Sequence, residues 1–188
     1  MKRGILGTFL VAATLVATAA TAVAADKGTK PPLIGADLEK GVRHEILMYS
    51  HYTMWDDIGF RIDNGNVELL GAVSQPYKKS DIERIVQRIP GVTSVTNEIK
   101  VLPLSPQDNR LRLQVARAIY RDPALSRYGM GAVPSIHIIV DNGHVTLTGA
   151  VNNTVDKQVA GMRASGAGLS FGPVINNLTV DNPPAKKS

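Results

Sequence analysis

Cysteine is absent from the 188-residue sequence. The fold therefore has no disulfide bonds, and no thiol is available as a nucleophile. A lipoprotein anchor is also excluded, because such an anchor needs a cysteine at the cleavage site. Whatever stabilises the protein must come from packing, hydrogen bonds and ion pairs.

Sequence motifs of catalytic sites are missing as well. The chain has no G-x-S-x-G nucleophile elbow. The stretch from Gly166 to Phe171 is rich in glycine, but it lacks the third glycine of a dinucleotide-binding motif and the Gly-Lys pair of a phosphate-binding loop. The sequence thus favours a protein that is not an enzyme and that needs no cofactor.

Charged residues are absent between Gly4 and Ala25. Lys2 and Arg3 precede an apolar stretch, and Ala22-Val23-Ala24 has the small-residue pattern of a cleavage site. This arrangement predicts a signal peptide over residues 1–25 and a mature protein released into the periplasm. The alternative is an uncleaved anchor, since a spanning helix needs about 20 apolar residues, but the many alanines and threonines make this segment a poor one.

The excess of positive charge is small. Without Lys2 and Arg3, the net charge falls from +5 to +3. Such a balance gives little support to nucleic-acid binding, and an exported protein seldom meets nucleic acid. We therefore expect no nucleic-acid partner.

An internal repeat dominates the rest of the chain. Residues 58–73 match residues 136–151 at a constant offset of 78 residues. Both copies contain an Asn-Gly pair, at Asn64-Gly65 and Asn142-Gly143, which favours a two-residue type I′ turn in a β-hairpin. The turn pairs apolar residues on one face of each hairpin. The pairs are Ile62 with Val67, Phe60 with Leu69, Val140 with Val145 and Ile138 with Leu147.

Helical patterns flank each hairpin. The preceding helices have apolar residues at helical spacing: Leu38, Val42, Ile46 and Tyr49 in the first copy, and Leu111, Val115, Ala118 and Ile119 in the second. After the first hairpin, Ser80-x-x-Glu83 predicts a capping box that starts a second helix, and Pro90-Gly91 ends it. In the second copy, the corresponding helix and the loop after it are expected to be interrupted by four glycines, Gly161, Gly166, Gly168 and Gly172, and to form the least ordered part of the chain.

A third strand is predicted after the second helix. Its alternating residues are Val95, Asn97, Ile99 and Val101 in the first copy, and Val174, Asn176, Leu178 and Val180 in the second. Each copy is thus an α-β-β-α-β module. The predicted fold class is α+β, with two tandem modules, each a three-stranded mixed sheet with two helices packed on one face.

The repeat also predicts the domain boundaries. A segment of residues 26–35 precedes module one, which covers 36–103, and a linker of residues 104–108 leads to module two, which covers 109–182. Residues 183–188 form a tail. Module one carries more acidic than basic residues, and module two carries the reverse.

These motifs resemble the BON family. Its hairpin pattern D-G-x-V-x-L-x-G-x-V corresponds to Asn64 through Val73, and its pattern G-V-x-x-V-x-N-x-[IL]-x-V corresponds to Gly91 through Val101. The second copy keeps the hairpin pattern but only part of the strand pattern. The resemblance implies a non-enzymatic role at the bacterial envelope: association with phospholipid surfaces, maintenance of envelope integrity, or chaperone-like help to other exported proteins.

The four histidines are not expected to share a metal ion. The hairpin register puts His137 and His144 on the outward face, well separated, and His44 and His51 are at best two helical turns apart. All four are interpreted as exposed structural residues. The adjacent pair Asp56-Asp57 is interpreted as turn or capping residues.

A binding surface is predicted on the first helix of module two. At 100° per residue, the side opposite its core residues carries apolar residues among arginines, a pattern suited to an anionic bilayer. The corresponding positions of module one hold a weaker version, Lys40, His44 and Leu47. The candidate membrane-binding residues are Arg110, Leu113, Arg117, Tyr120, Arg121 and Arg127.

Charge alone would give weak attachment. About 1 kcal/mol per basic residue gives about 4 kcal/mol for four arginines, or about millimolar affinity, so insertion of Leu113 and Tyr120 or binding by several copies is also required. Alternatively, Leu113 and Tyr120 pack against the other module. The arginines are then solvated. A separate hypothesis is a soluble chaperone-like or scaffold protein that binds other envelope proteins through apolar surface or sheet edges.

Overall fold

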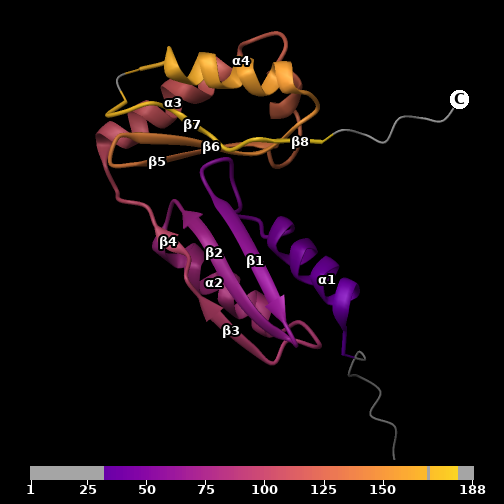
Figure 1. The fold of residues 1–188 in the computed structure, drawn as a ribbon. Helices are drawn as coiled ribbons and strands as arrows, with labels where there is room; N and C mark the ends of the chain where they lie inside the picture. The colour runs from indigo at the N-terminus through magenta and orange to yellow at the C-terminus, as the bar shows by residue number, and fades with distance from the viewer. Residues whose placement is uncertain (1–31, 169, 182–188) are drawn as a thin grey trace, which may run out of the picture. The chain divides into compact units, whose positions relative to one another are not determined.

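The computed structural model describes residues 32–168 and 170–181 (Figure 1). The predicted signal peptide, the part of segment 26–35 that precedes Pro32, and the tail 183–188 lie outside the described residues. All described residues belong to one compact unit. Within these ranges, no helix is both long enough and apolar enough to span a membrane.

Module one has two helices and a mixed sheet. Its elements are α1 (Gly35–Leu47), β1 (Asp57–Asp63), β2 (Asn66–Val73), α2 (Pro76–Gln87), β3 (Ser94–Asn97) and β4 (Lys100–Val101). β2 is central, because it pairs antiparallel with β1 on one side and parallel with both β3 and β4 on the other.

Module two repeats this order with one addition. Its elements are α3 (Pro106–Tyr120), a 3₁₀ turn η1 (Ser126–Gly129), β5 (Ile136–Asp141), β6 (His144–Val151), α4 (Thr154–Ser165), β7 (Ile175–Asn176) and β8 (Thr179–Val180). β6 is central between β5 and the short parallel strands β7 and β8. Figure 1 shows α3 and α4 on the same side of this sheet.

The predicted fold class and hairpin registers are confirmed. The four predicted apolar cross-strand pairs occur as expected. Each module buries one cluster of apolar residues contributed by both helices and by the inner face of its sheet. Helix α3 begins at Pro106, inside the segment predicted as the linker.

Two glycine positions explain the hairpin motif. Gly65 and Gly143 have φ of +84° and +79° in the turns, next to asparagines that also have positive φ, as type I′ turns require. Gly71 and Gly149 lie within strands at φ of +104° and +102°, where a Cβ atom would come within about 2 Å of a carbonyl oxygen on the neighbouring strand. No side chain fits there, so the motif requires glycine.

An asparagine breaks the third strand in both modules. Asn97 Nδ2 donates to the carbonyl of Lys79 on α2, and Asn97 Oδ1 accepts from the backbone of Ile99. Asn176 makes the same two contacts, with Lys157 and Leu178. The asparagine of the strand motif therefore fastens the third strand to the second helix of its own module.

Two helix predictions were wrong. α2 begins at Pro76, one turn before the predicted capping box, because Pro76 occupies the first helical position and Ser80 donates to the Tyr77 carbonyl inside the helix. α4 runs past Gly161 without interruption and ends at Ser165, with Gly166 as its C-cap. Gly161 serves packing, since a Cβ atom there would lie 2.8 Å from the Asn176 side-chain amide.

Candidate functional site: an arginine surface on module two

Helix α3 presents arginines on the side opposite its core residues. Its N-terminus is capped by Ser105, whose hydroxyl accepts from the Asp108 amide at 3.2 Å. Leu111, Val115 and Ile119 are buried in the module-two core. The three exposed arginines, Arg110, Arg117 and Arg121, lie within about 40° of one another around the helix axis.

A hollow of about 530 Å³ lies between the end of α3 and α4. Arg117, Arg121 and Arg163 line it, together with Met162. Arg163 Nε donates to Asp122 Oδ2 at 2.7 Å, which orients that guanidinium group. The pKa of Asp122 is lowered by hydrogen bonds from the Ala124 amide and from Arg163. Three guanidinium groups and one carboxylate thus leave an excess positive charge at the hollow.

Acidic side chains do little to neutralise this surface. Asp108, Asp122 and Asp156 are buried, and Asp141 is ion-paired with Lys100. Of the described acidic residues in module two, Asp181 alone is exposed and without an ion pair. Arg110, Arg117 and Arg121 of α3 therefore face solvent, whereas Arg112 is buried; Asp122, which lines the hollow beside Arg117 and Arg121, is paired with Arg163.

Apolar side chains accompany the arginines. Leu113 is 47% exposed on α3, and Met162 is 66% exposed on α4 beside the hollow. Leu113 also borders a hollow of about 340 Å³ with Trp55 of module one. The surface therefore combines guanidinium groups with apolar side chains, as membrane-interface helices do.

Tyr120 does not belong to this surface. Its ring packs against the module-two core, and its hydroxyl donates to the Ile136 carbonyl on β5. Burial raises the pKa of the Tyr120 hydroxyl. The expectation that Tyr120 lies exposed among the arginines is therefore corrected. It lies at the flank of α3, where the edge of the sheet covers it.

Arg127 is the second residue that the structure places differently. Its guanidinium group pairs with Asp156 and lies 5.0 Å from the centre of the Tyr128 ring. Burial by itself would raise the pKa of Asp156, but hydrogen bonds from Tyr128 and Arg127 outweigh it and lower the pKa. Arg127 thus has an internal partner, whereas Arg110, Arg117 and Arg121 have none among the described residues.

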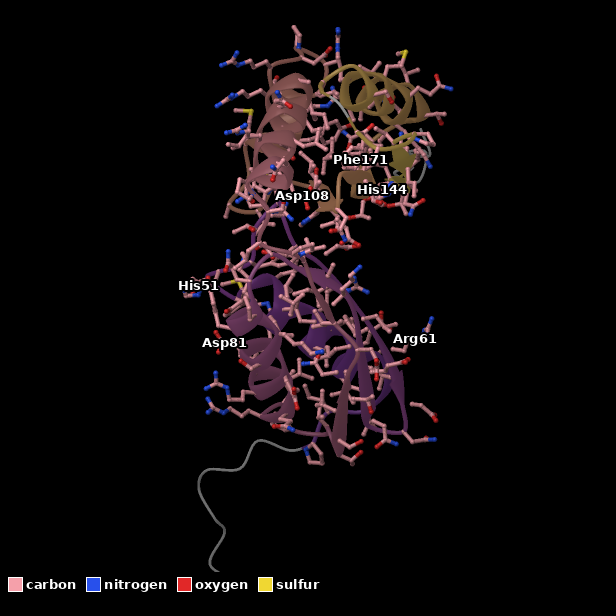
Figure 2. All side chains as sticks on the ribbon, turned by 90° about the vertical axis from the view of Figure 1, so that its left-hand side faces the viewer. His51, Arg61, Asp81, Asp108, His144 and Phe171 are labelled. Atoms are coloured by element: carbon pink, nitrogen blue, oxygen red, sulfur yellow. The ribbon has the colours of Figure 1, made fainter. Side chains whose placement is uncertain are left out.

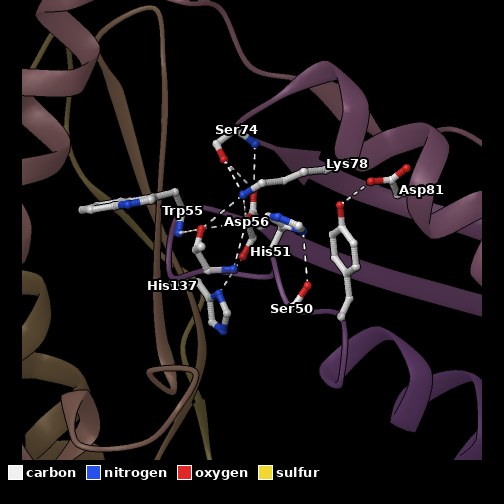
Figure 3. Close-up of polar contacts among 10 residues, drawn as sticks. Ser50, His51, Trp55, Asp56, Ser74, Lys78, Asp81 and His137 are labelled. Atoms are coloured by element: carbon white, nitrogen blue, oxygen red, sulfur yellow. Dashed lines mark hydrogen bonds and ion pairs between the residues drawn. The ribbon is translucent and has the colours of Figure 1, made fainter.

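Module one contains a buried ion pair that no sequence pattern indicated (Figure 3). Asp56 is 0% exposed, and its Oδ2 lies 2.6 Å from Lys78 Nζ. Thr53 and Ser74 each donate to Asp56 through backbone N–H and hydroxyl. Burial opposes ionisation of Asp56, but these donors lower its pKa overall. With every contact satisfied internally, the cluster is structural.

His137 is buried, which corrects the prediction of an exposed histidine. It is 8% exposed, its Nδ1 lies 2.6 Å from the Asp56 carbonyl oxygen, and its ring lies 5.3 Å from the Tyr52 ring. The covering residues come from module one, so the pattern of a single module could not reveal this burial. Within the described ranges, no group of three or more histidine and acidic side chains is arranged to hold a metal ion.

The geometry defines a duplicated α+β module with an exposed basic and apolar surface on module two. The BON domain model matches residues 36–103 and 107–182. The chain belongs to the BON domain family. Members of this family are generally non-enzymatic and typically periplasmic or envelope-associated, and the family is linked to phospholipid binding.

Comparisons with curated proteins and with solved structures add little to the family match. No curated protein matches the chain. Among solved structures, the chain is similar to CdsD, a structural protein of the type III secretion system of Chlamydia trachomatis. The match is 15% identical, covers 77% of this chain and 61% of that one, and has a TM-score of 0.31. The C-terminal domain of CdsD matches at 14% identity over 80% of this chain and 100% of that one, with a TM-score of 0.29.

Proposed function

We propose that this protein is an exported, non-enzymatic envelope protein whose module two associates with anionic phospholipid surfaces and so supports envelope integrity. The observation that carries the proposal is the hollow lined by Arg117, Arg121 and Arg163 beside the exposed Met162. Guanidinium groups bind phosphate oxygens in a bidentate manner, and the neighbouring apolar side chain enters the headgroup region.

The proposed contact surface differs from the predicted residue set. Arg110, Leu113, Arg117 and Arg121 remain in it. Met162 and Arg163 join it because they line the hollow, although Arg163 also pairs with Asp122. Tyr120 leaves it because its ring packs against the core, and Arg127 leaves it because it pairs with Asp156 and does not line the hollow. About 1 kcal/mol per basic residue still limits the charge contribution to a few kcal/mol. The rest of the binding free energy comes from insertion of the Leu113 and Met162 side chains.

Vesicle flotation tests the proposal. The full chain is expected to float with vesicles that contain phosphatidylglycerol and not with purely zwitterionic vesicles, and binding is expected to weaken as salt screens the charges. Arg117→Glu combined with Arg121→Glu should weaken binding about thirtyfold or more, because about 2 kcal/mol is lost before any repulsion is added.

The matched control changes two basic residues of module one in the same way, Lys79→Glu with Arg88→Glu. Neither side chain forms an ion pair among the described residues, and the change in net charge is identical. The control should retain most of the binding. Equal losses in both double variants, or no loss in the α3 variant, would contradict a specific surface on module two.

A further inference from the structure

Arg112 on α3 is a buried charge whose hydrogen-bonding groups are only partly used. The side chain is 5% exposed. Its Nη1 donates to Asn109 Oδ1 at 2.6 Å and its Nη2 to the Val140 carbonyl at 2.7 Å, which uses two of the five N–H groups of a guanidinium. Among the described residues, Nε has no hydrogen-bond partner and no carboxylate forms an ion pair with Arg112. Burying a charge in this way is unfavourable.

The other buried charged side chains have direct partners. The ion pairs are Asp56 with Lys78, Asp122 with Arg163 and Asp156 with Arg127. Asp108, near the start of α3 (Figure 2), accepts from the amides of Asn142 and Gly143 at 3.0 and 2.9 Å. Of the buried charged side chains that the structure describes, Arg112 alone keeps a nitrogen atom without a partner.

More distant carboxylates do not replace a direct partner of Arg112. Burial lowers the pKa of its guanidinium group, and the charges of Asp108, Asp56 and Asp141 oppose this effect only in part. All three carboxylates are engaged by other donors, Asp141 by Lys100. Arg112 nevertheless stays charged, because an arginine side chain keeps its proton in proteins.

Arg112 also lines the hollow of about 340 Å³ between the two modules. The lining residues are Trp55, Ser74 and Gln75 of module one and Asn109, Arg112 and Leu113 of module two. Arg112 is the one charged residue among them. The Trp55 ring is half-buried and points away from the Asp56–Lys78 cluster (Figure 3). The hollow thus combines one guanidinium group and two side-chain amides with an apolar wall of Trp55 and Leu113.

We propose that this hollow binds a small organic carboxylate that carries an apolar group. The carboxylate accepts from the guanidinium group of Arg112 and from Asn109 Nδ2, and the apolar group packs against the Trp55 ring and Leu113. One guanidinium group matches one negative charge, whereas a phosphate monoester carries up to two near neutral pH. This site goes beyond membrane association, and its ligand contacts both modules.

Fluorescence of Trp55 provides the test, because the chain contains a single tryptophan. The full chain is titrated with 3-phenylpropionate, and a saturable change in Trp55 emission is expected. The neutral amide of the same acid, 3-phenylpropanamide, should bind about tenfold more weakly or worse, because it has no charge to pair with the guanidinium group. Acetate, which lacks the ring, should also bind more weakly.

Asn109→Asp supplies a counter-ion for Arg112 from within the protein. Asn109 is exposed, lies three residues before Arg112 on α3 and already contacts its guanidinium group. The new carboxylate should pair with Arg112 and repel the probe, so binding of 3-phenylpropionate should weaken about tenfold or more. The midpoint of thermal unfolding should not fall, which confirms that the variant is folded.

The matched control is Gln107→Glu. It makes the same change in charge in the same first turn of α3, but Gln107 does not line this hollow. This variant should bind 3-phenylpropionate as the unmodified protein does. Equal losses in the two variants would mean that the charge of the helix end, and not the pairing of Arg112, controls binding, and the proposal would be overturned.

Other results would also overturn the proposal. These are equal binding of the acid and its amide, Trp55 emission that responds to neither, and binding of glycyl-glycyl-phenylalanine at least about tenfold tighter than that of 3-phenylpropionate, which would assign the hollow to the end of a polypeptide chain. The variant Arg117→Glu with Arg121→Glu separates this proposal from membrane association. It should lose vesicle binding and keep binding of 3-phenylpropionate.

Discussion

Modules one and two satisfy the same backbone amide with different side chains. The amide that follows the central strand is that of Ser74 in module one and Asn152 in module two, at the repeat offset of 78 residues. Ser74 donates to Asp56 at 2.8 Å, and Asn152 donates to the Tyr128 hydroxyl at 2.8 Å. This amide donates a hydrogen bond in both modules, but a different residue accepts it in each.

The third residue of the helix that follows the central strand also differs between the modules, and the two residues carry opposite charges. Lys78 of α2 pairs with Asp56, and the equivalent Asp156 of α4 accepts from Tyr128 and Arg127. Module one therefore depends on a buried ion pair, and module two on a buried hydroxyl with a half-exposed ion pair. A duplicated fold need not have duplicated energetics.

The largest expected effect comes from breaking the buried pair. Lys78→Met should lower the free energy of unfolding by about 3–5 kcal/mol, because Asp56 would remain buried without its cation. Denaturant unfolding monitored by circular dichroism measures this loss. Adding Asp56→Asn to the variant should restore part of the stability, since the amide oxygen still accepts from Ser74. A loss below about 1 kcal/mol would show that the pair is not the main support of module one.

A smaller effect is expected in module two. Tyr128→Phe should lower the free energy of unfolding by about 1–3 kcal/mol, because Asn152 loses its acceptor while packing is unchanged. The same unfolding measurement applies, with Tyr77→Phe as the control, since Tyr77 is 47% exposed. If both variants lose equal stability, the hydroxyl of Tyr128 has no special role and the comparison between the modules fails at this point.

Local patterns predicted most of the fold. Asn-Gly turns and alternating apolar residues predicted the hairpins and their registers. Helical spacing predicted three core residues each in α1 and α3, but Tyr49 lies beyond the end of α1 and Ala118 lines the hollow instead of the core. The start of α2 was predicted wrongly because Ser80 and Glu83 have the spacing of a capping box but lie inside the helix. Gly161 was misread because its small size serves a contact with Asn176, which is distant in sequence.

The candidate site was less predictable than the fold. Arg110, Leu113, Arg117 and Arg121 lie exposed as expected, because helical periodicity alone separates them from the core. Tyr120 lies on the flank of α3, where periodicity does not decide burial. Long-range contacts were invisible for a different reason: nothing near His137 or Lys78 in the sequence indicates the residues that bury them.

The strand edges complete the comparison. In module two, the Ile136 and Val140 carbonyls and the Ile138 amide of edge strand β5 form hydrogen bonds within the protein, and α3 exposes an arginine surface. Among the described residues, no hydrogen bond is formed with the outward N–H or C=O groups of Phe60 and Ile62 on edge strand β1. We assign the lipid-binding surface to module two.

The most direct test of membrane binding by module two is an NMR titration of the full chain with phosphatidylglycerol-containing bicelles. Backbone amide shifts are expected to concentrate in residues 110–121 and 161–166, while the amides of β1 and α1 remain unchanged. Purely zwitterionic bicelles should have little effect. Shifts centred on β1 or α1, or the same response to both lipid compositions, would contradict the assignment of membrane binding to module two.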